Sequence, residues 1–271
     1  MLNALSAKKA LALGIATGFI LSGAIGFYVI VPMALRAETP TAILDDRIEP
    51  NNTETAEQNA LPNIPKNDKP KVELFVMSYC PFGLQMEKAY TPVWNLLKNK
   101  ADLSVKFVSY AMHGKIEVDE NTRQHCIQQE EGADKFITYL NCFSLKNDSA
   151  GCLNQSGINN AKINSCVEKT NKNFAILDKY NDKSTWLNGR FPLYPVHENL
   201  NDEYGVQGSP TLVINGTQVQ TERTPEGIKN AICAAFNNAP SECSKKLSNT
   251  PATPGFGAGE GVDTGDAGCG N

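Results

Sequence analysis

The chain has 271 residues, a formal net charge of −4 and 41% hydrophobic residues, as expected for a folded protein of one or two domains. No dense cluster of lysine and arginine is present, which argues against a nucleic-acid partner. Eight cysteines are typical of an oxidising compartment. No two of them form a Cys-x-x-Cys pair, and the three histidines lack metal-site spacing, so the sequence predicts no metal and no other cofactor.

A long uncharged segment follows Lys8 and Lys9 near the start of the chain and runs from Ala10 to Leu35. Because about 20 apolar residues span a bilayer, residues 10–35 are predicted to anchor the protein in the cell membrane. Residues 1–9 would lie in the cytoplasm and the remainder on the extracytoplasmic side. The alternative is a secretory signal that is cleaved near Ala34 or Ala37.

Two segments lack the patterns of folded structure. Residues 36–70 contain five prolines and no aromatic residue, which predicts a disordered linker. Residues 244–271 are rich in glycine and show no periodicity, which predicts a disordered tail. The folded domain is therefore expected to comprise residues 71–243.

The domain is organised around a strand that ends at Cys80 and is followed at once by a helix. Residues 74–77 form an apolar run of strand length, and Pro81 suits the first turn of a helix. From Gly83 to Lys98 the apolar residues share one side, with Gln85, Glu87, Lys88 and Lys98 mostly opposite. Cys80 is thus placed at a helix N-terminus, where a cysteine pKa falls from about 8.5 to between about 3.5 and 7.5.

A second stretch, residues 204–216, contains Ser209-Pro210 before a short apolar strand and an Asn215-Gly216 turn. In this order, the two stretches resemble the active-site elements of thioredoxin-fold disulfide oxidoreductases, particularly DsbA-like ones. The resemblance implies an α/β fold of βαβ…ββα order, with Pro210 in the cis form and facing Cys80. It covers residues 71–111 and about 200–238.

The resemblance assigns catalytic roles to Cys80, Pro81 and Pro210. Next to these residues, Tyr79, Phe82 and Ser209 are candidates for substrate binding. Gly83 departs from the family pattern, because it stands where the second cysteine of the motif belongs. A buried structural role for Cys80 is the alternative, since free cysteine is often buried. His113 is a candidate base for the thiolate, with a solvated loop histidine as the alternative.

Between these stretches, residues 103–110 are predicted to form a second, parallel strand, and residues 112–186 a helical insertion. Four helices are expected in the insertion, at 119–131, 133–145, 158–170 and 173–180. Because small helical hairpins have little core, two disulfides are favoured, Cys142–Cys152 and Cys126–Cys166, although other pairings are compatible with the sequence.

After the predicted hairpin, Thr224 and Pro225 open the last helix, as N-cap and first helical residue. Cys233 in that helix and Cys243 beyond it are expected to pair. This scheme leaves Cys80 and Cys269 over. A flexible tether of 26 residues from Cys243 spans roughly 25–30 Å, so Cys269 is a candidate resolving thiol for Cys80. Otherwise it is a tail cysteine without an intramolecular role, or one that joins two chains.

The resulting hypothesis is a membrane-tethered, extracytoplasmic thiol–disulfide oxidoreductase or isomerase. Its substrates would be exported proteins with thiols or disulfides, which Cys80 attacks as a thiolate. The rival is a redox-inactive binding or chaperone-like module, which the missing motif cysteine favours. The sequence does not identify a redox partner.

Overall fold

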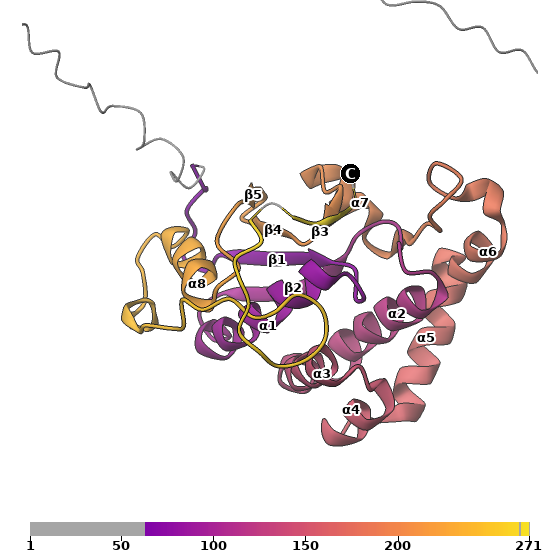
Figure 1. Ribbon diagram of the computed structural model, residues 1–271, viewed down its shortest axis with the longest axis horizontal. Coiled ribbons are helices and arrows are strands. Elements are labelled where there is room, and N and C mark those ends of the chain that lie inside the picture. The colour runs from indigo at the N-terminus through magenta and orange to yellow at the C-terminus, as the bar shows by residue number, and fades with distance from the viewer. Residues whose placement is uncertain (1–62, 266, 271) are drawn as a thin grey trace, which may run out of the picture. The chain divides into compact units, whose positions relative to one another are not determined.

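The computed structural model describes residues 63–265 and 267–270. Its central sheet has the strand order β2-β1-β4-β5 (Figure 1). The strands are β1 (Lys71–Val76), β2 (Asp102–Phe107), β4 (Thr211–Ile214) and β5 (Thr217–Val219). β1 pairs parallel with β2 and antiparallel with β4, and β4 pairs antiparallel with β5. With helix α1 (Pro81–Leu97) between β1 and β2 and α8 (Pro225–Ala234) after β5, this is the predicted thioredoxin-like βαβ…ββα fold.

Side chains of β1 alternate between two cores, because successive residues of a strand face opposite sides of the sheet. Val72, Leu74 and Val76 join the larger core, which α1, α8 and the helical insertion cover. Phe75 and Met77 join a smaller core on the other side, together with Cys80 and Val213. Helix α7 (Glu198–Tyr204) covers this second side, and Figure 1 shows α7 and α1 on opposite sides of the sheet.

The insertion after β2 is helical, as predicted. Its helices are α2 (Lys115–Glu130), α3 (Ala133–Lys146), α4 (Ser149–Gln155), α5 (Asn160–Phe174) and α6 (Ile176–Asn181). Helix α4 was not predicted, because its polar and glycine-containing sequence is typical of a loop. Asp148 caps it by accepting a hydrogen bond from the Gly151 backbone N–H at 2.9 Å.

The structure contains the three disulfides expected for the domain. Cys126–Cys166 and Cys142–Cys152 connect helices of the insertion, and Cys233–Cys243 fastens the segment that follows α8. All six cysteines have Cα–Cα separations between 5.6 and 5.8 Å within their pairs. Each such bridge typically stabilises a small domain by about 2–4 kcal/mol.

The second half of the sheet also follows the sequence pattern. Asn215 and Gly216 both have positive φ and connect β4 to β5, as the hairpin signal predicts. Thr224 caps α8 by accepting a hydrogen bond from the Gly227 backbone N–H at 3.0 Å, and Pro225 is the first helical residue.

The prediction of a disordered tail is wrong for the described residues after 243. Glycine-rich composition gives no internal periodicity, but the tail is held by side chains of other elements. Lys88 of α1 donates hydrogen bonds to the carbonyl oxygens of Thr253, Gly255 and Gly257, at 2.7, 2.8 and 3.0 Å. Figure 1 shows the yellow tail passing in front of α1 and ending beside β3.

The predicted linker also ends earlier than expected. Ile64 is buried in the larger core, and the Asn67 backbone N–H donates to the Ala235 carbonyl oxygen at 2.9 Å. The predicted anchor at residues 10–35 lies outside the described residues. Within the described part of the chain, no helix is long and apolar enough to cross a membrane.

Two histidines pack edge to face beside β2, with the ring centroids of His125 and His197 5.3 Å apart. Nδ1 of His197 accepts a hydrogen bond from the Phe107 backbone N–H at 3.0 Å. Burial lowers the pKa of His197 to about 2 and that of His125 to about 4, and the nearby Lys106 ammonium acts in the same direction. Both rings are therefore neutral at neutral pH.

Lowering the pH from 7 to 5 is expected to decrease the free energy of unfolding. The unfolded rings, with a pKa of about 6.5, take up protons that the folded rings exclude, so the folded state loses about 1–2 kcal/mol for each ring. Denaturant titrations at several pH values measure this loss, and His125→Asn should reduce it. His113 is the control, because its ion pair with Glu117 raises its pKa. His113→Asn should make the loss larger, and a loss unaffected by either substitution contradicts the assignment.

Candidate functional site

Cys80 is the N-cap residue of α1, and Pro81 is the first helical residue, as the sequence predicts. The Gly83 backbone N–H points at the Cys80 sulfur, with 3.4 Å between the nitrogen and Sγ. An N–H donor and the positive end of the helix dipole both favour a thiolate over a thiol.

The Ser209-Pro210 peptide bond is cis and lies against Cys80, as the resemblance implied. The Ser209 carbonyl oxygen is 3.4 Å from the Cys80 sulfur. The hydroxyl of Ser209 accepts a hydrogen bond from the Met77 backbone N–H at 2.9 Å. Ser209 thus links the cis-proline loop to the turn that carries the cysteine.

Cys80 forms a disulfide with Cys269, 189 residues further along the chain. The Cα atoms of the two cysteines are 6.0 Å apart. Two short strands pair antiparallel at this point, β3 (Gly208–Ser209) and β6 (Cys269–Gly270), with Ser209 opposite Cys269. The pairing of the two leftover cysteines, one of three alternatives at the level of sequence, is the arrangement found in the structure.

Helix α2 of the insertion fixes the turn before Cys80 from the other side. Asn121 Oδ1 accepts from the Ser78 backbone N–H at 3.1 Å, and Glu117 Oε2 accepts from the Tyr79 backbone N–H at 3.1 Å. Neither residue was identified from the sequence, because nothing in a helical pattern shows which polar side chains reach a distant turn. His113 Nδ1 is 2.6 Å from Glu117 Oε2, so His113 pairs with a carboxylate of the site's support.

Gly83 lies where the cis-proline loop closely approaches α1. A Cβ atom at this position would lie 2.7 Å from the Ser209 hydroxyl oxygen and 3.2 Å from the Met77 carbonyl oxygen. Real Cβ contacts are longer than the first of these distances. The structure therefore leaves no room for a second motif cysteine at position 83 without displacement of Ser209.

The two aromatic candidates for substrate binding, Tyr79 and Phe82, are packed against other parts of the chain. Tyr79 packs edge to face against Phe143 of α3 and Phe256 of the tail. Phe82 lies beneath the guanidinium of Arg223, 5.6 Å from its ring centroid. Of the candidate substrate-binding residues, Ser209 contacts the disulfide, whereas Tyr79 is covered by the tail.

Two polar residues of α1, Gln85 and Glu87, are buried, whereas Lys98 at the end of the helix is exposed. Gln85 is buried beneath the tail, where its amide donates to the carbonyl oxygens of Ala252 and Val262 at 2.8 and 3.0 Å. Glu87 is fully buried against the insertion, and burial together with the nearby Glu120 raises the pKa of its carboxyl well above the ordinary value. A neutral carboxyl is consistent with this position.

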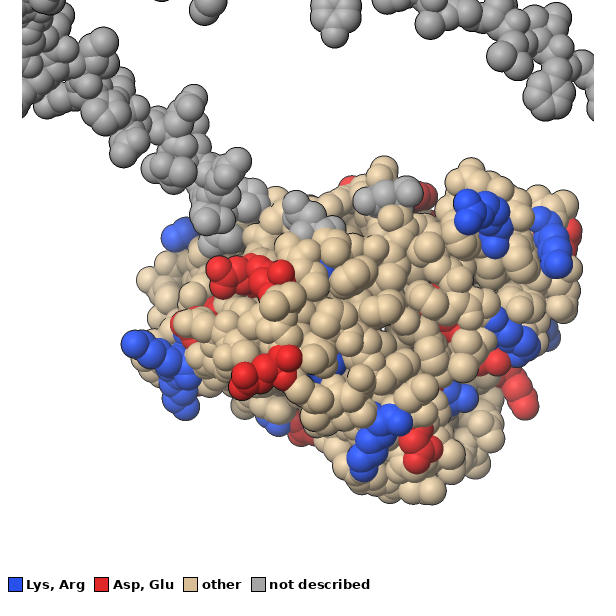
Figure 2. Space-filling model, in the orientation of Figure 1, with Lys and Arg blue, Asp and Glu red and all other residues tan. Residues whose placement is uncertain are grey.

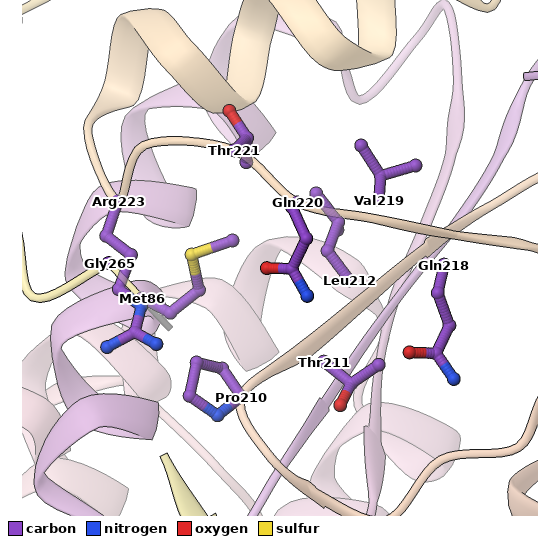
Figure 3. Close-up of a pocket in the computed structure, with 10 residues that line it drawn as sticks. All are labelled: Met86, Pro210, Thr211, Leu212, Gln218, Val219, Gln220, Thr221, Arg223 and Gly265. Carbon is purple, nitrogen blue, oxygen red and sulfur yellow. The ribbon is translucent and has the colours of Figure 1, made fainter. Parts of the chain in front are cut away.

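A hollow of about 210 Å³ flanks the disulfide along β3 and β6. Its lining includes the uncharged polar side chains of Thr211, Gln218 and Gln220, and it continues into a smaller pocket beside Pro210 and Arg223 (Figure 3). The centre of the face shown in Figure 2 carries few charged side chains. Within the described residues, no group of histidine, cysteine, aspartate and glutamate side chains has the arrangement of a metal site.

No protein-family profile matches the chain, and no curated protein sequence matches it significantly. Several solved structures are similar. Oxidised DsbA from Mycobacterium tuberculosis has 12% identity and a TM-score of 0.46, with 67% of this chain and 95% of that chain covered. The reduced disulfide oxidoreductase DsbG from the same organism has 15% identity and a TM-score of 0.44, with 65% and 82% covered.

Oxidised BdbD from Bacillus subtilis has 18% identity and a TM-score of 0.41, with 65% of this chain and 92% of that chain covered. These similarities are too distant to carry an argument about activity. The chemistry of this chain therefore rests on the geometry around its own Cys80 and Cys269.

Replacing Gly83 by alanine tests the close approach of α1 and the cis-proline loop. Helix propensity alone predicts that Gly83→Ala stabilises the protein by about 1 kcal/mol. The contact with Ser209 predicts the opposite sign, a loss of about 1–3 kcal/mol from overpacking. Chemical denaturation measures which effect is larger. A stabilised variant would mean that Ser209 yields without cost and that position 83 has room for a side chain.

Proposed function

We propose that this chain is a thiol–disulfide oxidoreductase whose redox pair is Cys80 and Cys269. The observation that carries the proposal is the disulfide between them, formed at the N-terminus of α1 and against the cis-proline loop. The other three disulfides connect neighbouring elements of the domain and have ordinary structural positions. This one joins a helix N-terminus to the last described residues of the chain.

The reaction starts from the reduced protein, in which Cys80 is a thiolate stabilised by the Gly83 backbone N–H and the helix dipole. Its sulfur attacks a substrate disulfide, forming a mixed disulfide and releasing one substrate thiolate. The Cys269 thiolate then attacks the Cys80 sulfur of the mixed disulfide. The second substrate sulfur leaves as a thiolate and takes a proton from solvent, so the substrate gains the two electrons that the enzyme loses. The reverse sequence oxidises a dithiol.

Cys269 supplies what Gly83 cannot. A motif with a single cysteine has no resolving thiol of its own. In the sequence, this missing cysteine favoured the rival hypothesis of a redox-inactive binding module. With Cys269 bonded to Cys80, the chain contains a complete dithiol pair, although the two members come from opposite ends of the domain.

The substrates we propose are exported proteins, and the compartment is extracytoplasmic. Four disulfides in the described part of the chain suit an oxidising compartment, and the segment 10–35 would serve as the membrane anchor. Cell fractionation with protease shaving tests this part separately. A domain protected from protease in intact cells would exclude the extracytoplasmic location. A soluble form that starts near Glu38 would exclude only the membrane anchor.

Disulfide-reductase activity of the full chain tests the redox pair. Cys80→Ser is expected to lower the rate at least 100-fold, because the attacking thiolate is lost. Cys269→Ser is expected to retain the first step and to accumulate mixed disulfides at Cys80, which mass spectrometry after acid quenching detects. The matched control replaces Cys142 and Cys152 together by serine, which removes a disulfide of the insertion and leaves the redox pair intact. Equal activity of the wild type and the Cys80→Ser variant would refute the proposal that this chain is a thiol–disulfide oxidoreductase acting through Cys80.

A further inference from the structure

The tail strand β6 pairs with the backbone edge of β3, directly beside the Cys80–Cys269 disulfide. Gly270 lies opposite Gly208, and Cys269 lies opposite Ser209, in antiparallel pairing. An extended peptide binds to an exposed strand through the same kind of backbone hydrogen bonds. A substrate segment whose cysteine is bonded to Cys80 lies at the same place, because the Ser209 carbonyl oxygen is 3.4 Å from the Cys80 sulfur.

The fit of the tail to this edge depends on a glycine. A Cβ atom on Gly270 would lie 2.1 Å from the Tyr110 hydroxyl oxygen and 2.8 Å from the Gln207 carbonyl oxygen. These two groups hold each other, since the Tyr110 hydroxyl donates to the Gln207 carbonyl oxygen at 2.7 Å. Gly270 also has a φ of +105°, which side chains disfavour. The end of the tail is thus shaped to lie on β3.

The arm that carries Cys269 is short and starts from a fixed point. The Thr264 hydroxyl donates to Gln85 Oε1 at 2.6 Å, and the Arg223 guanidinium donates to Thr264 Oγ1 at 2.5 Å. The Arg223 guanidinium also donates to the Ala267 carbonyl oxygen, two residues before Cys269. When this bond opens, the five residues from Thr264 to Cys269 reach about 17 Å in extended form. Once its disulfide opens, the arm can leave β3 but stays within reach of it, at a high effective concentration.

We propose that β6 and an extended segment of the substrate are alternative occupants of the β3 edge. In the oxidised protein, the chain's own tail closes the edge and Cys80 is fully buried. In the reduced protein, the edge is open to a cysteine-containing segment of a protein substrate. The resolving step then couples two events, because the return of β6 forms the Cys80–Cys269 bond and displaces the substrate strand.

The expected ligand is an extended segment around the substrate cysteine that carries no positive charge. The hollow beside β3 is lined by amide and hydroxyl side chains, together with Arg223, and by no carboxylate. This inference rests on the proposed function for its covalent step. Its test measures occupancy of the β3 edge rather than turnover. Failure of the shared-edge proposal is therefore distinguishable from failure of the proposed redox activity.

The test is amide hydrogen exchange over residues 205–212 in the full-length Cys269→Ser variant, with Cys80 blocked in two ways. One sample carries 2-mercaptoethanol as a mixed disulfide, and the other carries a blocked peptide that copies residues 267–270. Exchange should be slow in the oxidised wild type, at least tenfold faster in the mercaptoethanol sample, and slow again in the peptide sample. Fast exchange in both samples overturns the shared edge. Slow exchange in both samples shows that the tail stays on β3 without its disulfide. That result overturns the proposal that reduction opens the β3 edge to a substrate.

A matched pair of glycine substitutions tests the fit of the tail in the otherwise unaltered chain. Gly270→Ala should shift the Cys80–Cys269 pair toward the dithiol at least tenfold in a glutathione redox buffer. Gly265→Ala is the control, because Gly265 also has a positive φ but a Cβ atom there meets nothing within 4 Å. Equal shifts for the two variants would show that the contact with Tyr110 does not select glycine.

Discussion

The position of the Cys80 sulfur depends on how the three residues before it are held. Their backbone N–H groups donate to side chains from two different parts of the chain, Ser209 of the cis-proline loop and Asn121 and Glu117 of α2. Each bond satisfies a buried or half-buried donor that would otherwise lack a partner in the turn. The helical insertion therefore helps to position Cys80 and also adds to the core.

Close approach at this site is achieved by the absence of side chains. Gly83 lets the cis-proline loop contact α1, and Gly270 lets the tail lie on β3 beside Tyr110. Both positions lie within a few ångströms of the disulfide, and at both a methyl group would meet an oxygen atom. Ser209 takes part in both contacts, because its hydroxyl lies against Gly83 and its backbone pairs with Cys269.

Polar side chains that a helical pattern assigns to solvent hold the tail instead. Gln85 and Lys88 of α1 together reach carbonyl oxygens of five tail residues, Ala252, Thr253, Gly255, Gly257 and Val262. A glycine-rich segment presents its backbone freely, so side-chain donors can replace the missing internal hydrogen bonds. Phe256 adds an apolar contact with Tyr79 and Phe143.

Local sequence signals determined the elements of the fold and the first half of the site. The apolar run before Cys80, Pro81 at the helix start, the Asn215-Gly216 turn and the Thr224 cap each act over a few residues, and the structure contains all of them. These features are local, because backbone conformation and capping depend on neighbouring residues. Cys142–Cys152 and Cys233–Cys243 each join cysteines 10 residues apart, whereas Cys126–Cys166 spans 40 residues and was one of several pairings compatible with the sequence.

Tertiary structure decided which of the long-range contacts around Cys80 form. The contacts of Glu117 and Asn121 with the turn, the burial of Gln85 and Glu87, and the ordered tail all join segments far apart in the sequence. The Cys80–Cys269 bond could be stated as one alternative from the sequence, by counting the cysteines left over. In the structure, the pairing of β6 with β3 places Cys269 beside Cys80. An edge strand can pair with any segment that lies next to it in space, however far away that segment is along the chain.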